Sequence, residues 1–237
     1  MTELLQSHLL TSLLAIAGTI GLFQLLAMLQ SKLQAIWLQP MLISILVIIA
    51  MLLWQNISFY AYFSNVWLLN ALLEPAVVAL GFPLYQHLDT ITKQWKTILL
   101  VLFIGACVAI STSFIITMLL IGDYSIAVAL SLKSVTTPIA IVIAGQLDGN
   151  TALTAFAIIL AGFFGALVGP PWLRFIKVKS PKAQGLAIGA ASHAIGTVTV
   201  SHISYEHGAY SSLALIASAV ITALISPWLI NFLTTLL

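Results

Sequence analysis

Long apolar stretches separated by short polar ones run along most of the chain. A membrane-crossing helix rises about 1.5 Å per residue and needs about 20 apolar residues to pass the hydrocarbon core. Several stretches meet this length without a strong polar interruption, and they cover residues 9–29, 34–54, 63–85, 97–120, 151–173 and 209–235. The pattern therefore predicts six crossing helices.

Two further apolar stretches, 124–146 and 184–203, are interrupted near their middle. The interruptions are Lys133, Ser134, Thr136, Thr137 and Pro138 in the first stretch, and Ser192, His193, Gly196 and Thr197 in the second. Proline lacks a backbone donor and disfavours helix in the residue before it, so the first stretch should unwind there. Each stretch is predicted to be either a re-entrant, broken-helix hairpin or an unwound crossing helix.

The positive charges favour the hairpins. Lys and Arg concentrate in cytoplasmic loops. Outside the apolar stretches, this chain has Lys32, Lys93, Lys96, Arg174, Lys177, Lys179 and Lys182. If both interrupted stretches are hairpins, all of these residues lie on one side, with both termini outside. If both stretches cross, the charges divide between the two sides. We expect six crossings and two hairpins, with eight crossings as the alternative.

Composition places the whole chain in a membrane. Of 237 residues, 61% are hydrophobic and 6% are charged, whereas soluble domains carry about 25% charged residues. The net charge of +2 provides no basic stripe for nucleic acid. Cys107 is the single cysteine, and no metal, nucleotide or other cofactor motif is present. We expect one all-α polytopic membrane domain over 1–237, with N-terminal helices at 1–62 and a core at 63–237.

The core contains a weak internal repeat. A shift of 56 residues places Thr136-Thr137-Pro138 over Ser192-His193-Ala194 and Pro171-Trp172 over Pro227-Trp228. The repeated units are about 127–173 and 183–229. Each unit pairs one hairpin with one crossing, so the second copy would be inverted, as in many transporters with discontinuous helices. A row of glycines within the first repeat, 127–173, predicts close helix packing, at Gly162, Gly165 and Gly169.

Lys133 is the strongest candidate for chemistry. A charged residue at the centre of a membrane helix costs about 2.5–3.5 kcal/mol on insertion scales, so its ammonium needs a partner. An anionic substrate is one, and the hydroxyls of the same break could complete the hydrogen bonding. An ion pair with Glu74 or Asp148, or a side chain that reaches the membrane surface, would be structural alternatives.

The second break supplies a candidate facing wall. Ser192, His193 and Thr197 provide polar contacts, while Gly196 permits close backbone approach. The alternative is that this histidine only bonds between helices. Glu74 and His193 are candidates for a coupled proton. An intramembrane serine hydrolase is disfavoured because the G-x-S-x-G elbow is missing, and we expect no enzyme.

Several motifs together resemble the LrgB/CidB family of bacterial membrane proteins, whose plant relatives include the plastid glycolate/glycerate translocator. They are Leu72-Leu73-Glu74-Pro75-Ala76-Val77-Val78, Lys133-Ser134-Val135-Thr136-Thr137-Pro138, Ser192-His193-Ala194-Ile195-Gly196-Thr197 and Gly208-Ala209-Tyr210-Ser211-Ser212. The resemblance runs from about Leu72 to the C-terminus.

The resemblance implies a secondary transporter of small monocarboxylates or hydroxycarboxylates, such as glycolate, glycerate or pyruvate, in the bacterial inner membrane. Its partners would be a small organic anion, the lipid bilayer and an LrgA/CidA-type small membrane protein. The small-residue face from Gly162 to Gly169 could serve internal packing or a homo-oligomer equally well. Older descriptions of the family imply an alternative, a holin/antiholin-like regulator of murein hydrolases and lysis.

Overall fold

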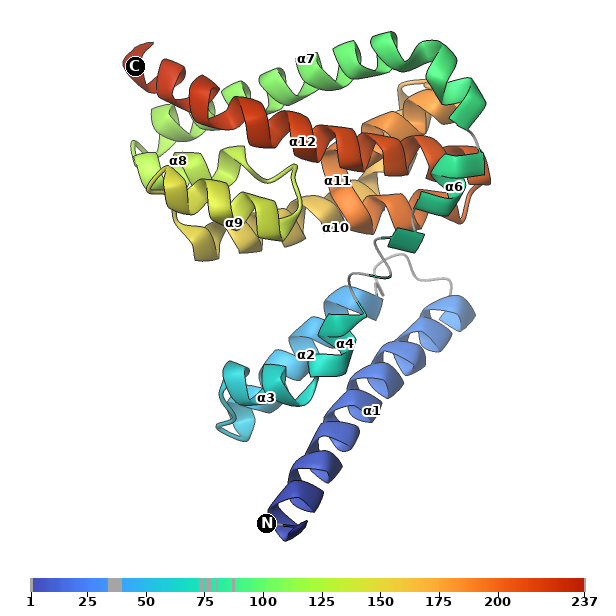
Figure 1. The fold of residues 1–237 in the computed structure, drawn as a ribbon, viewed down its shortest axis with the longest axis vertical. Coiled ribbons are helices and arrows are strands. Elements are labelled where there is room, and N and C mark those ends of the chain that lie inside the picture. The colour runs from blue at the N-terminus through green and yellow to red at the C-terminus, as the bar shows by residue number, and fades with distance from the viewer. Residues whose placement is uncertain are drawn as a thin grey trace. The chain divides into compact units, whose positions relative to one another are not determined.

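The computed structural model describes residues 2–33, 40–72, 75, 78–79, 81–86 and 88–236, and these fold into two compact units divided between residues 77 and 78. Every regular element in this described part is helical (Figure 1). The chain is thus an all-α protein, as predicted.

The described residues of the first unit form the helices α1 (Thr2–Leu33), α2 (Pro40–Trp54), α3 (Phe59–Asn65) and α4 (Trp67–Ala71). Polar side chains hold α1 to α3 in an otherwise apolar unit. The Ser12 hydroxyl donates to Asn65 Oδ1 at 3.0 Å, and the hydroxyls of Thr19 and Tyr62 lie 2.8 Å apart. Large apolar side chains on α1 point outward, as contact with lipid requires.

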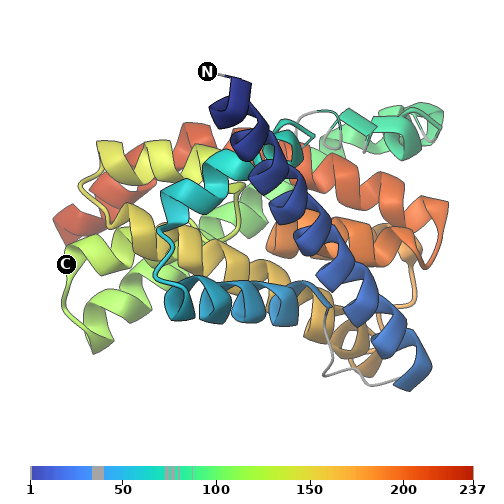
Figure 2. The same cartoon turned by 90° about the horizontal axis from the view of Figure 1, so that it is seen from below.

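The second unit contains seven helices in the described part of the chain. They are α6 (Gly81–Gln86), α7 (Leu88–Leu120), α8 (Tyr124–Ser131), α9 (Thr137–Gln146), α10 (Thr151–Phe175), α11 (Pro181–Ser201) and α12 (Tyr205–Leu236). The long helix α12 runs the length of this unit in both views (Figures 1 and 2). Apolar side chains such as Leu100 and Leu119 on α7 and Leu224 on α12 are exposed on the outer surface of this unit, which suits a bilayer.

Within the described ranges, four helices are long and apolar enough to cross a membrane: α1 over Leu9–Leu33, α7 over Ile91–Leu120, α10 and α12. A fifth is added if α2 and α3, bent by 119°, form one span. The predicted crossings at 9–29, 97–120, 151–173 and 209–235 correspond to the four long helices. The described chain is therefore a multi-pass membrane protein with four or five candidate spans.

The crossing predicted over 63–85 does not form one helix. The chain breaks after Asn65, where the side-chain amide donates to Ala61 O at 2.9 Å and the carbonyl accepts from Ser12. Asparagine competes in this way with the helix main chain. The predicted crossing over 34–54 is described only as α2, because residues 34–39 lie outside the described residues.

Both predicted interruptions are present. Between α8 and α9 the chain leaves the helix over residues 132–136, and Thr136 is extended with φ −67° and ψ 143° before α9 begins. Within α11 the break falls at His193, with φ 39° and ψ −133°. The proline in the first turn of α9 explains why a new helix begins there, since its fixed φ suits that position.

The α8–α9 segment folds back on itself. The main-chain N–H of Asn150, just beyond α9, donates to the main-chain carbonyl of Ser125 in the first turn of α8, with N and O 3.3 Å apart. A Cβ added at Gly149 would lie 2.6 Å from Val128 Cγ1, so the two ends pack closely. We call residues 124–146 hairpin 1, with its tip at 132–136 and its base beside Asp123 and Asp148.

The two halves of α11 also fold back, around His193. Near its start, Gln184 Oε1 lies 3.2 Å from His207 Nε2, and near its end Ser201 packs on Gly208. Both ends of α11 therefore lie at the first turn of α12. We call residues 181–201 hairpin 2, with its tip at His193. Its base follows the C-terminal end of α10, whereas the base of hairpin 1 precedes the N-terminal end of the same helix.

Candidate functional site

The tips of the two hairpins meet. The ring of His193 lies beside the main-chain carbonyl groups of Lys133 and Ile158. A Cβ added at Gly162 would lie 2.5 Å from His193 Cε1, and one at Gly165 would overlap Ser192. The glycine row on α10 thus provides the space in which the tip of hairpin 2 reaches hairpin 1.

Lys133 projects from the tip of hairpin 1 toward α7. Its side chain is partly buried, and its ammonium donates a hydrogen bond to the hydroxyl of Ser113. No ion pair of Lys133 with a carboxylate occurs within the described part of the chain, which includes Asp148 but not Glu74. A neutral hydroxyl does not balance the charge, so this ammonium retains the capacity to bind an anion.

The other predicted residues of hairpin 1 differ in their surroundings. Ser134 lines a cavity described below, and Thr136 is the N-cap of α9 without a side-chain cap bond. Thr137 is partly buried in the first turn of α9, and Pro138 beside it is exposed. Within this break, Ser134 therefore faces the cavity and Lys133 carries the free charge, while Pro138 determines where the helix restarts.

The predicted residues of hairpin 2 are deeply buried. Ser192 and Thr197 have no exposed surface, and His193 is 4% exposed. Thr197 Oγ1 donates to the His193 carbonyl at 2.8 Å and lies 2.9 Å from Ser211 Oγ on α12, whereas Gly196 packs against Ser192. Ser192 Oγ and His193 Nε2 have no hydrogen-bond partner among the described residues. Thr197 and Gly196 thus have structural roles, and Ser192 and His193 keep free polar atoms.

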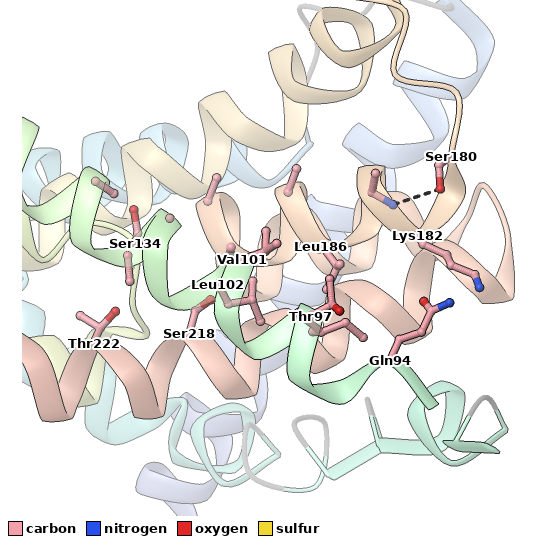
Figure 3. A pocket seen from close by; sticks show the side chains of 18 residues that line it. Gln94, Thr97, Val101, Leu102, Ser134, Ser180, Lys182, Leu186, Ser218 and Thr222 are labelled. Carbon is pink, nitrogen blue, oxygen red and sulfur yellow. Dashed lines mark hydrogen bonds between the residues drawn. The ribbon is translucent and has the colours of Figure 1, made fainter. Parts of the chain in front are cut away.

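A cavity of about 800 Å³ leads to this region between α7, hairpin 2 and α12. Ser134, Ser218 and Thr222 lie at its inner end, and Gln94, Ser180 and Lys182 lie at its mouth (Figure 3). Apolar side chains such as Val101, Leu102 and Leu186 line the part between. Along α7 the lining runs from Gln94 to Ala109, which corresponds to about 22 Å of helix.

Ser113 is one helical turn beyond Ala109 on α7, so the contact between Lys133 and Ser113 lies next to the inner end of this cavity. Among the described residues, Ser134 is the only predicted site residue in the cavity lining. Three lining residues, Ser218, Thr222 and Lys182, are not among the site residues predicted from the sequence. The signal for the first two is a row of hydroxyl residues along one face of α12, at Ser211, Ser218, Thr222 and Ser226.

One predicted residue takes no further part in the described site. Glu74, a candidate for a coupled proton, lies outside the described residues. Within the described ranges, no group of three or more His, Cys, Asp or Glu side chains is placed to hold a metal ion.

This arrangement defines a class: multi-pass membrane proteins in which two folded-back helical hairpins meet beside a largely apolar cavity that carries hydroxyl side chains at one end. The sequence profile of the LrgB-like family matches residues 19–232, and the chain belongs to this family. The match begins well before Leu72, so it includes most of the first unit.

Individual relatives match over nearly their full length. The holin-like protein CidB of Staphylococcus epidermidis (strain RP62A) is 34% identical over 225 residues, covering 93% of this chain and 96% of the relative. The holin-like protein CidB of Staphylococcus aureus (strain Mu50) is 32% identical, with 92% and 96% covered. YxaC of Bacillus subtilis is 30% identical, with 93% and 97% covered. No solved structure matches the chain.

Proposed function

We propose that this protein is a secondary transporter of small monocarboxylates or hydroxycarboxylates across the bacterial cytoplasmic membrane. The observation that carries the proposal is the meeting of two hairpin tips next to a lysine. The first half of hairpin 1, 8 residues, rises about 12 Å, and the first half of hairpin 2, residues 181–192, rises about 18 Å. Together they equal the thickness of the hydrocarbon core, about 30 Å. Tips that meet from opposite faces therefore lie near mid-membrane.

The order of elements supports the inverted repeat proposed for 127–173 and 183–229. A folded-back hairpin is followed by a long helix twice, first as α8–α9 and α10, then as α11 and α12. The two hairpin bases lie at opposite ends of α10, as inversion requires. Substrate sites of inverted-repeat transporters lie between such discontinuous helices, where half-helix ends and polar side chains replace water around the solute.

The chemistry of the tips suits a small monovalent anion. Lys133 supplies one positive charge, which is matched by one carboxylate. Ser134, which follows Lys133 in the chain, and the ring of His193 offer hydrogen-bonding atoms at the same tips. Within this proposal His193 is the described candidate for a coupled proton, and the protein performs no covalent chemistry on its substrate.

The charges at the two hairpin bases indicate how the protein is oriented in the membrane. Lys177, Lys179 and Lys182 lie around the base of hairpin 2, and Asp123 and Asp148 lie at the base of hairpin 1. By the positive-inside rule, the base of hairpin 2 faces the cytoplasm. The 800 Å³ cavity then opens toward the cytoplasm and forms the inner path to the site.

Uptake into proteoliposomes tests the function. Purified protein reconstituted in liposomes should accumulate labelled glycolate, lactate or pyruvate above the level of protein-free liposomes, and unlabelled substrate should compete. No uptake of any of these acids, with protein shown to be correctly inserted, would contradict the transport proposal.

Orientation can be measured by cysteine accessibility. On a Cys107→Ser background, Asp123→Cys and Asp148→Cys should both react with an impermeant maleimide added outside cells, because both positions lie at the base of hairpin 1. Lys179→Cys should react only after permeabilisation. Reaction of Asp123→Cys and Asp148→Cys from opposite sides would instead mean that residues 124–146 cross the membrane, as in the alternative to a hairpin.

Lys182 at the cavity mouth should attract anions into the path. Its ammonium lies 5.6 Å from the centre of the Tyr210 ring and lines the cavity. Lys182→Gln should lower the initial rate of loading from the cytoplasmic face about threefold at low ionic strength. The difference from wild type should vanish near 1 M salt, where the screening length is about 3 Å. The control is Lys179→Gln, which changes an exposed lysine in the loop just before α11 and should alter the rate little.

The holin-like names of the Staphylococcus relatives favour a second candidate function, a regulator of murein hydrolase activity that acts with an LrgA/CidA-type partner. Such a protein needs assembly and lesion formation, and it does not need a specific anion site. Release of a large dye from vesicles that contain both proteins, with no dependence on Lys133, would support this function. Substrate-specific uptake by the single protein supports transport.

A further inference from the structure

The inner end of the cavity combines one residue of a predicted break with two residues of α12. Ser134 comes from the tip of hairpin 1, and Ser218 and Thr222 come from consecutive turns of α12. Figure 3 shows Ser218 and Thr222 on the same face of α12, with Ser134 across the end of the cavity. We call these three residues the hydroxyl cluster.

Ser218 has the clearest unused hydrogen-bonding capacity. It is 5% exposed, and its Oγ has no hydrogen-bond partner among the described residues. Burying a hydroxyl without a partner is unfavourable, so such groups in a cavity wall call for a ligand or water. Other hydroxyls on the same helix do have partners. Thr234 Oγ1, for example, donates to the Ile230 carbonyl one turn earlier in α12 at 2.8 Å.

The chemistry of a hydroxyl differs from that of the lysine. An ammonium only donates hydrogen bonds and therefore pairs with a carboxylate, which only accepts them. A serine or threonine hydroxyl both donates and accepts, as does a hydroxyl group on a substrate. The lysine and the hydroxyl cluster lie at the same end of the cavity, because the ammonium of Lys133 bonds to Ser113, one helical turn beyond the lining residue Ala109, so one small molecule could engage both.

We infer that the hydroxyl cluster binds the hydroxyl group of a hydroxycarboxylate while Lys133 holds its carboxylate. The inference rests on the proposed transport function and names two binding residues, Ser218 and Thr222, on α12. It also sets the selectivity: a carboxylate without the hydroxyl leaves Ser218 unpaired and should bind more weakly.

Ser226 is a matched control for Ser218. Both serines are on α12, both are buried, and both have an Oγ without a partner among the described residues. Only Ser218 of this pair lines the cavity. Loss of a buried hydroxyl affects folding similarly in the two variants, so a difference in transport between them reports binding.

Proteoliposome uptake with Ser218→Ala and Ser226→Ala tests the inference, with two acid pairs that differ by one hydroxyl, glycolate with acetate and lactate with propionate. Ser218→Ala should raise the KM for glycolate and lactate about tenfold and leave the weaker competition by acetate and propionate unchanged. Ser226→Ala should leave all four values unchanged. Equal effects of the two variants, or equal loss for acids with and without the hydroxyl, would overturn the inference while wild-type uptake still upholds transport.

A second measurement does not depend on active transport by the variant. On a Cys107→Ser background, Ser218→Cys should react with a small thiosulfonate, and lactate should slow the reaction at least threefold more than propionate at the same concentration. Equal protection by both acids, or none, would also overturn the inference. If wild-type protein takes up no carboxylate in the first experiment, transport fails, and the inference fails with it.

Discussion

Glutamine in place of Lys133 should reduce carboxylate uptake by about 30- to 100-fold. A hydrogen bond to a charged group contributes about 1.5–3 kcal/mol, and removal of the one ammonium at the hairpin tips leaves the carboxylate of the substrate without its counter-charge. Glutamine keeps a hydrogen-bond donor on a side chain that is one atom shorter, so the tip of hairpin 1 should remain folded. Initial rates of labelled lactate uptake in proteoliposomes measure the effect.

Two controls separate the charge from the fold. Lys177→Gln removes a charge from an exposed loop at the base of hairpin 2 and should leave uptake within about twofold of wild type. Thermal unfolding of Lys133→Gln in detergent should resemble that of wild type, or show greater stability, because the variant no longer buries a charge. Unchanged uptake by a folded Lys133→Gln protein would exclude a role for this ammonium as the anion site.

Local sequence chemistry was sufficient to predict the breaks. The proline of Thr137-Pro138 and the polar residues around Lys133 predicted an interruption where the structure has one, and the second interruption falls at His193 as the 56-residue shift indicated. The close packing expected of Gly162, Gly165 and Gly169 is confirmed by contacts of all three with hairpin 2. In each case the determining property belongs to a few adjacent residues.

Features that depend on distant contacts could not be predicted in the same way. Apolar length suggested a crossing over 63–85, but the Asn65 side chain bonds to Ser12, more than 50 residues away, and helps to end α3. The row of hydroxyl residues on α12 does not by itself single out Ser218 and Thr222, because Ser and Thr are common in membrane helices. Their place in a cavity follows only from the packing of α7 and hairpin 2 against α12.

The packing of hairpin 2 on α12 leads to the second large effect, which concerns stability. A Cβ added at Gly189 would overlap the main-chain carbonyl of Ser211, and the nearby Gly185 has a similar contact with the carbonyl of His207 at 2.7 Å. A main-chain group within a long helix cannot rotate away as a side chain can. Gly189→Ala should therefore force hairpin 2 away from α12 and destabilise the protein by about 2–3 kcal/mol.

Gly105→Ala is the appropriate comparison, because a Cβ at that position on α7 meets no atom within 4 Å. Alanine is the better helix former, so this variant should be as stable as wild type or slightly more stable. In detergent, the unfolding midpoint of Gly189→Ala should fall about 5–10 °C below that of Gly105→Ala. Equal midpoints would mean that hairpin 2 does not pack on α12 through this glycine. Because the same contact positions the tip of hairpin 2 beside Lys133, Gly189→Ala protein that remains folded should also have weakened transport.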